Sequence, residues 1–118
     1  MATIRITNLK LRAVIGINDW ERDNKQDVVI NITLNYDASK AAESDRVEDT
    51  IDYKTLTKKI IRLVENSQFY LLEKLAEVIL QMSLEHPLVQ AAWVRVDKPL
   101  ALRFADSVSV ELQRSKSQ

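Results

Sequence analysis

The order of the apolar patterns along the chain constrains its fold more than any other feature. Apolar and polar residues alternate in segments 30–36, 90–97 and 104–113, whereas two central segments repeat apolar residues every three or four positions. Alternation predicts half-buried strands, and the longer spacing predicts amphipathic helices. With another strand near the N-terminus, the order becomes ββααββ. We therefore expect an α+β fold in which two helices cover one face of a four-stranded antiparallel sheet.

The first strand changes phase near its middle. Ile4 and Ile6 share one phase, whereas Leu9 and Leu11 follow the other. This shift around Thr7-Asn8 predicts a β-bulge or bend.

The helices have clear boundaries in the sequence. Asp52 is the expected N-cap of the first helix, whose apolar face would hold Tyr53, Leu56, Ile60, Leu63 and Val64. The second helix would end near His86-Pro87 and bury Leu72, Leu75, Ala76, Ile79 and Met82. Segment 39–52 is acidic and is expected to be irregular; its spacing matches no calcium loop. His86 suits a cap or surface role, and the tryptophans Trp20 and Trp93 suit packing.

The uncovered face of the predicted sheet is polar but well patterned. It would present Asn31, Thr33, Trp93, Arg95, Ser107 and Ser109. The edges of such a sheet offer unpaired N–H and C=O groups, which proteins usually pair or cover. We therefore expect the edges to pair with other subunits, and a closed ring would also shelter this polar face.

Composition narrows the class of protein. The 118 residues suit one domain and carry 17 basic and 17 acidic side chains, so we expect no nucleic-acid or membrane partner. Without cysteine there is neither a disulfide nor a thiolate, and one histidine cannot supply the usual zinc ligands. We see neither a signal peptide nor a membrane-spanning apolar run. We expect a cytoplasmic protein.

Four polar residues lie where predicted elements begin or end: Glu21, Tyr53, Glu73 and Lys98. Glu73 falls in the first turn of a helix, where the helix dipole favours an anion. Its carboxylate can accept two parallel hydrogen bonds from a planar amidine-like edge, such as that of a pterin or guanine. Lys98 precedes Pro99, which favours an extended backbone. Each residue alone also has a purely structural explanation: a solvated loop, a core aromatic, a helix-stabilising charge and a strand end.

Four motifs in this order and spacing change that balance: "IGINDWERDNKQ", "DTIDYKTLT", "FYLLEKLAEVI" and "VRVDKP". Together they resemble the dihydroneopterin aldolase family, which includes dihydroneopterin triphosphate 2'-epimerases. The likeness runs from about residue 4 to residue 112, so residues 1–118 are expected to form a single domain of this family. It implies the tunnelling fold, with ββααββ subunits joined into a tetrameric ring or a stacked octamer that forms a barrel.

The resemblance also assigns roles to residues. It implies that Glu73 and the backbone of Leu72 anchor the pterin ring, with Ile51 among the binding residues. Tyr53, reaching from a neighbouring subunit, would stack on the ring and take part in proton transfer. Glu21 would contact the substrate side chain. Lys98 would act as the general acid and base through water.

The chemistry implied is a retro-aldol cleavage of 7,8-dihydroneopterin without Schiff base, metal or cofactor. We place the aldolase of folate biosynthesis first, with some C2' epimerase activity, and a dedicated triphosphate 2'-epimerase second. The motifs favour the aldolase, whereas the flanks "IRITNLKLRAVIGI" and "ALRFADSVSVEL" favour the epimerase. A triphosphate would need cations such as Arg22, Lys25, Arg95 and Arg103. A non-catalytic pterin- or purine-binding oligomer also stays open.

Overall fold

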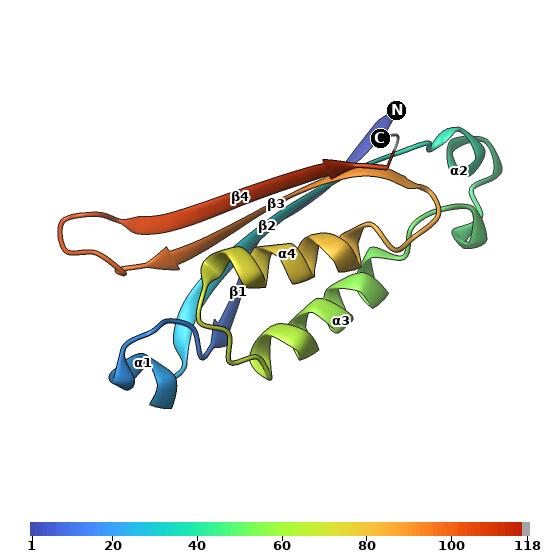
Figure 1. The fold of residues 1–118 in the computed structure, drawn as a ribbon. Helices are drawn as coiled ribbons and strands as arrows, with labels where there is room; N and C mark the ends of the chain where they lie inside the picture. Colours follow the sequence, from blue (N-terminus) through green and yellow to red (C-terminus); the bar gives the residue numbers. More distant parts are fainter. Residues whose placement is uncertain (117–118) are drawn as a thin grey trace.

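The computed structural model describes residues 1–116 and contains one four-stranded sheet (Figure 1). Its strands are β1 (Ala2–Ala13), β2 (Gln26–Tyr36), β3 (Val89–Pro99) and β4 (Ser107–Ser115). They lie side by side in chain order and every neighbouring pair is antiparallel. The expected sheet is thus confirmed, and β1 and β4 are its two edges.

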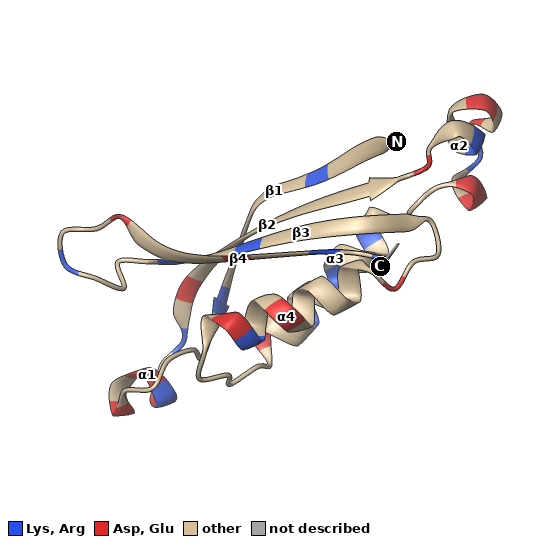
Figure 2. Ribbon diagram, turned by 45° about the horizontal axis from the view of Figure 1, so that its top comes forward, with Lys and Arg blue, Asp and Glu red and all other residues tan. Residues whose placement is uncertain are grey.

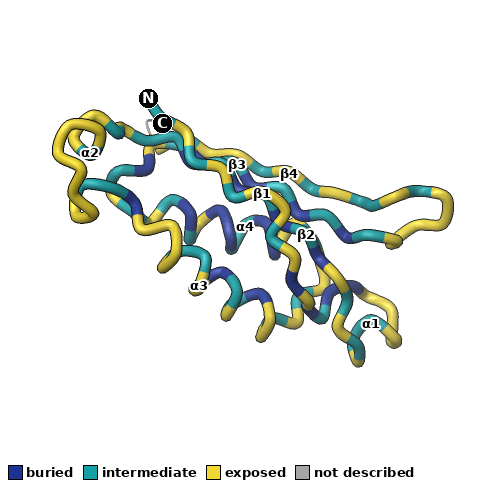
Figure 3. The backbone as a smooth tube through the Cα atoms, turned by 180° about the vertical axis from the view of Figure 1, so that it is seen from behind, coloured by how far each residue is buried: buried dark blue, intermediate teal, exposed yellow. Residues whose placement is uncertain are grey.

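The two long helices, α3 (Tyr53–Glu65) and α4 (Leu72–Ser83), cover one face of this sheet. Every second residue of β2 from Val28 to Leu34 is buried against them, as are Val94 and Val96 of β3. The helices contribute Ile60, Val64, Leu75, Ala76, Ile79 and Leu80 to the same core. Figure 3 shows the buried residues on the strands and on the two long helices, with exposed segments at both ends. Alternation therefore dictates which strand face meets the helices.

The predicted bulge in β1 is present. Pairing with β2 shifts between Ile6 and Leu9, and Asn8 has a φ of 54°. Asn31 holds this turn on the uncovered face. Its Oδ1 accepts the Asn8 N–H at 2.8 Å, and its Nδ2 donates to the Asn8 Oδ1 at 3.2 Å. An asparagine tolerates the left-handed backbone that the extra residue requires.

Several local expectations were wrong. Segment 39–52 is not irregular throughout but contains α2 (Ser39–Ser44) and the 3₁₀ turn η1 (Val47–Asp49). Phe104, expected to begin the last strand, lies instead in the β3–β4 loop and is 99% exposed. Strand pairing ends at Pro99 and Ser107, and Leu100 and Phe104 adopt left-handed backbone conformations that turn the chain. Trp20 is 63% exposed rather than packed. Tyr53, expected on the apolar face of α3, is 52% exposed. The expected N-cap is present, since the Asp52 carboxylate accepts the Thr55 N–H at 3.1 Å.

The chain is elongated, 52 Å by 24 Å by 24 Å, and its two ends carry different elements. The α1 end holds the helix α1 (Asp19–Asp23), the loop before α4 and the end of β3. The α2 end holds α2, η1 and the start of α3. Among the described residues, no helix is both long enough and apolar enough to cross a membrane.

Candidate functional site

Glu21 and Lys98 form a buried ion pair at the α1 end. The Lys98 Nζ donates a hydrogen bond to the Glu21 Oε2, although the residues are 77 positions apart. Only 11% of the Lys98 side chain and 14% of the Glu21 side chain are exposed. The alternation of β3 turns Lys98 to the helix-covered face, in line with Val94 and Val96. Glu21 is therefore not a solvated loop residue; it lies in the one-turn helix α1.

Besides Lys98, one backbone group and one side chain hold the Glu21 carboxylate in place. The Asn18 N–H donates to its Oε1 at 3.2 Å, and Gln26 Nε2 donates to its Oε2 at 3.3 Å. Gln26 also donates to the Ile15 carbonyl at 2.9 Å, which fixes the amide. Gly16, with a φ of 128°, lies directly beneath the carboxylate, where an added Cβ would overlap it. Sequence reasoning missed Gln26, whose only signal was its place in the motif "DWERDNKQ".

These contacts determine the charge of Glu21. The hydrogen bond from Lys98 lowers the pKa of the Glu21 carboxyl, and those from Asn18 and Gln26 act in the same direction. Burial opposes this by disfavouring the charged form, but the net shift is downward. Glu21 is therefore a carboxylate at neutral pH.

Glu73 lies at the same end, in the first turn of α4 as predicted. The N-cap residue Leu71 makes no side-chain cap, so N–H groups of the first turn remain available. Within residues 1–116, the Glu73 carboxylate has neither an ion-pair nor a hydrogen-bond partner. The Gly16 N–H donates to the Phe69 carbonyl at 3.3 Å, which ties the loop before α4 to the loop before α1. An unpaired carboxylate thus lies at the same end as the buried ion pair.

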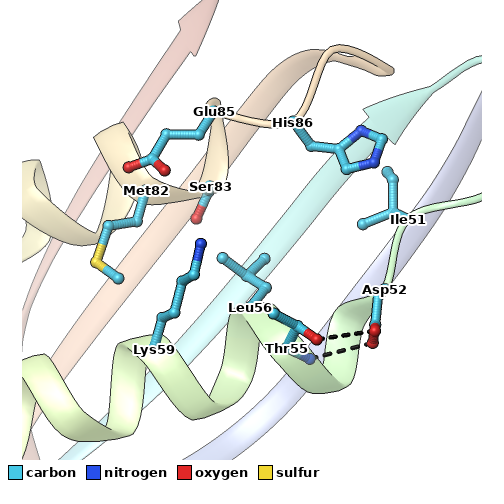
Figure 4. A pocket seen from close by; sticks show the side chains of 9 residues that line it. All are labelled: Ile51, Asp52, Thr55, Leu56, Lys59, Met82, Ser83, Glu85 and His86. Atoms are coloured by element: carbon cyan, nitrogen blue, oxygen red, sulfur yellow. Dashed lines mark hydrogen bonds between the residues drawn. The ribbon is translucent and has the colours of Figure 1, made fainter.

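Tyr53 and Ile51 lie at the α2 end, so one chain does not bring them to Glu21, Glu73 and Lys98. Tyr53 is 52% exposed, whereas Ile51 is buried. Ile51 lines a cavity of about 430 Å³ between α3 and α4, which Figure 4 shows with Lys59, Met82 and other lining residues. None of Glu21, Glu73 and Lys98 contributes to this cavity.

His86 also lines that cavity, and it is not a helix cap. Helix α4 ends at Ser83, three residues earlier. The His86 Nδ1 accepts the Leu88 N–H at 3.0 Å in the turn before β3. Its role is therefore to shape a turn.

Charged residues are spread along the whole molecule, on strands, helices and loops (Figure 2). Two of the four candidate cations are already engaged. Arg22 donates to the carbonyls of Gly16 and Phe69, and Arg95 is paired with Asp97 at 2.8 Å. Lys25 and Arg103 have no carboxylate partner in the described part of the chain.

Comparison with known proteins gives consistent results across the chain. The sequence profile of the family described as FolB, dihydroneopterin aldolase, matches residues 4–113. A dihydroneopterin triphosphate 2'-epimerase of Escherichia coli is 51% identical over 111 residues, covering 94% of this chain and 92% of that protein. A dihydroneopterin aldolase of the same organism is 32% identical over 119 residues, covering 99% and 96%.

A solved structure supports the same relationship. The structure of E. coli dihydroneopterin aldolase in complex with neopterin is similar with a TM-score of 0.92. It is 30% identical in sequence, and the match covers 98% of this chain and 100% of the other.

The ion pair predicts how stability depends on pH. A lowered folded-state pKa stabilises the protein above the unfolded pKa of Glu21, about 4.5, and this contribution is lost as pH falls through the folded value. In Lys98→Met the carboxylate loses its cation, so its pKa should rise. We expect the stability difference between wild type and Lys98→Met to be largest above pH 4.5 and to shrink below it. Urea unfolding across pH, at one protein concentration, measures this.

Lys58→Met, at an exposed lysine on α3, is the matched control and should show no such pH-dependent difference. A Lys98→Met difference that stays constant across the acid range would contradict the assigned state of Glu21.

Proposed function

Because the chain belongs to the dihydroneopterin aldolase family, which includes triphosphate 2'-epimerases, we propose that it cleaves the C1'–C2' bond of a dihydropterin side chain. The observation that carries this proposal is the buried Glu21–Lys98 pair at the end where α4 begins with the unpaired carboxylate of Glu73. One group would bind a heterocycle, and the other would move protons beside it. The E. coli aldolase structure that contains neopterin is consistent with a pterin ligand.

In this proposal Glu73 accepts two hydrogen bonds from the 2-amino group and N3 of the pterin. A carboxylate without an internal partner, near free N–H groups of a helix start, suits that planar edge. The backbone of Leu72 bonds the ring beside it. Glu21 contacts the hydroxylated side chain of the substrate and holds the Lys98 amine in place through their hydrogen bond.

The bond cleavage then proceeds as a retro-aldol step. The 2'-hydroxyl gives up its proton, and C2' becomes an aldehyde carbon as the C1'–C2' bond breaks. The electron pair of that bond forms C1'=C6, and the C6=N5 pair moves to N5, which takes up a proton. Lys98 relays these protons through water as general acid and base. The electron sink is the substrate's own imine, so neither a Schiff base nor a metal enters the step.

Two outcomes diverge from the resulting enamine. When the aldehyde leaves, protonation at C1' and loss of the N5 proton restore the C6=N5 bond and give 6-hydroxymethyl-7,8-dihydropterin. When the aldehyde instead rotates and adds back to C1', with loss of the N5 proton, C2' is inverted. The 51% identity to the epimerase, against 32% to the aldolase, favours inversion as the main outcome. With a triphosphate on C3', the aldehyde fragment would carry that triphosphate after cleavage. Nearby cations would keep this fragment bound, which favours re-addition. Among the described residues, Lys25 and Arg103 are the two of the four candidate cations that have no carboxylate partner, and they would be the ones to bind the triphosphate. The aldolase is the second candidate.

The site is proposed to form between two subunits in a homo-oligomeric ring. Exposed apolar side chains gather at the α1 end, where Ile17, Trp20, Tyr70 and Leu71 are each more than half exposed. The α2 end exposes Val47 and Tyr53. Contact between unlike ends would bury both sets and bring a neighbour's Tyr53 and the backbone of Ile51 to the pterin. Edge pairing of β1 with β4 of a neighbour would close the ring.

Product analysis separates the two outcomes. Purified protein is given 7,8-dihydroneopterin and, separately, its triphosphate, and products are followed by chromatography. We expect the triphosphate to yield mainly its C2' epimer. Release of an aldehyde with 6-hydroxymethyl-dihydropterin as the main product would establish the aldolase instead. Turnover of neither substrate, by correctly folded oligomer, would contradict both and favour a binding protein.

Substitutions at Lys98 and Glu73 should affect different steps. Lys98→Ala removes the proton relay, so kcat should fall by about 10²–10⁴-fold with little change in pterin affinity. Glu73→Gln replaces two acceptor oxygens with one acceptor and one donor, so the affinity for the pterin should fall more than kcat. Fluorescence titration and steady-state kinetics measure the two effects. Lys58→Ala serves as the control; normal affinity in Glu73→Gln would remove the anchor role.

A further inference from the structure

Helix α1 carries Glu21 but contributes no apolar side chain to the hydrophobic core. It is only five residues long. A helix this short is not stable by itself, and its position must come from tertiary contacts. Helix α4, by contrast, is fixed by four fully buried side chains: Leu75, Ala76, Ile79 and Leu80.

Arg22 connects these two elements. Its Nη1 donates to the Gly16 carbonyl at 2.9 Å and to the Phe69 carbonyl at 3.1 Å. Its Nη2 donates to the Gln68 carbonyl, and its guanidinium lies 4.0 Å from the centre of the Tyr70 ring. A planar fork of five donors can bind several carbonyls at once and stack on an aromatic ring, which a lysine cannot do. The side chain is half-buried, although no carboxylate pairs with it in the described part of the chain.

We propose that Arg22 is a positioning residue that docks α1 on the loop before α4 and thereby holds Glu21 at Lys98. Residues 68–70 lead directly into the first turn of α4, which carries Glu73. The same guanidinium therefore sets the distance between the proposed pterin anchor, Glu73, and Glu21 on α1. Because Arg22 is occupied by backbone carbonyls, it is not among the cations free to bind a triphosphate.

The inference rests on the proposed function, and its consequence differs from that of a stabilising contact alone. Loss of Arg22 would free α1 while α4 and Glu73 stay fixed by the core. Misplacing Glu21 by even 1 Å can reduce the rate by about 10²-fold. Pterin binding at Glu73 would change little. A residue that only stabilised the fold would lower the folded fraction and leave the kcat of the folded protein unchanged.

The test compares Arg22→Ala and Arg22→Lys with Arg62→Ala, a matched change at an exposed arginine on α3. For both Arg22 variants we expect kcat to fall by about 10²-fold, with little change in the Kd for the pterin substrate. Guanidinium ion at low concentration should restore part of kcat in Arg22→Ala alone. Carbonyl NMR titration of Glu21 should show its pKa moving up toward 4.5 as contact with Lys98 loosens.

Two results would overturn the inference. One is an unchanged kcat and an unchanged Glu21 titration in folded Arg22→Lys. The other is equal loss of kcat and pterin affinity, which would mean that both ends of the site depend on Arg22 alike. If the wild-type protein turns over neither substrate, the proposed function fails, whereas the Glu21 titration still tests the docking role.

Discussion

The contact between Glu21 and Lys98 links two parts of the chain that are far apart in sequence: the short helix α1, which follows the loop after β1, and the end of β3. A lysine on the helix-covered face of a sheet is costly unless its charge is matched. Glu21 supplies the match, and Gln26, Asn18 and Gly16 fix the position of its carboxylate. The position of α1 therefore depends on Lys98, whose amine needs a partner carboxylate at this buried place on the sheet.

The residues of the proposed site are divided between the two ends of one chain. Glu21, Glu73 and Lys98 lie at the α1 end, while Tyr53 and Ile51 lie at the other end of a 52 Å molecule. Within the described residues, the sheet also has two edge strands, β1 and β4, that pair on one side only. Both ends of the molecule expose apolar side chains. In a ring of subunits, pairing of β1 with β4 of a neighbour would satisfy the edges. Contact between unlike ends would cover the apolar side chains and complete the site.

The sequence predicted the sheet, the long helices and the β1 bulge because apolar periodicity reports which face each element buries. It predicted that Glu73 lies in the first turn of a helix, because a helix start is visible locally. It did not predict the state of Glu21, whose burial depends on Lys98 77 positions away. Gln26 and Arg22 donate hydrogen bonds to backbone carbonyls, and such contacts leave no pattern in the amino-acid sequence. Tyr53 fits the helical apolar spacing of α3 yet is exposed, since the first turn extends beyond the core.

A mixed oligomer tests most directly whether two chains share each site. Lys98→Ala and Tyr53→Ala variants, each inactive alone, are unfolded, mixed and refolded together. The account predicts that the mixture regains turnover, because some interfaces pair an intact α1 end with an intact α2 end. Mixtures that stay as inactive as the separate variants, although they form oligomers of normal mass containing both chains, would contradict it.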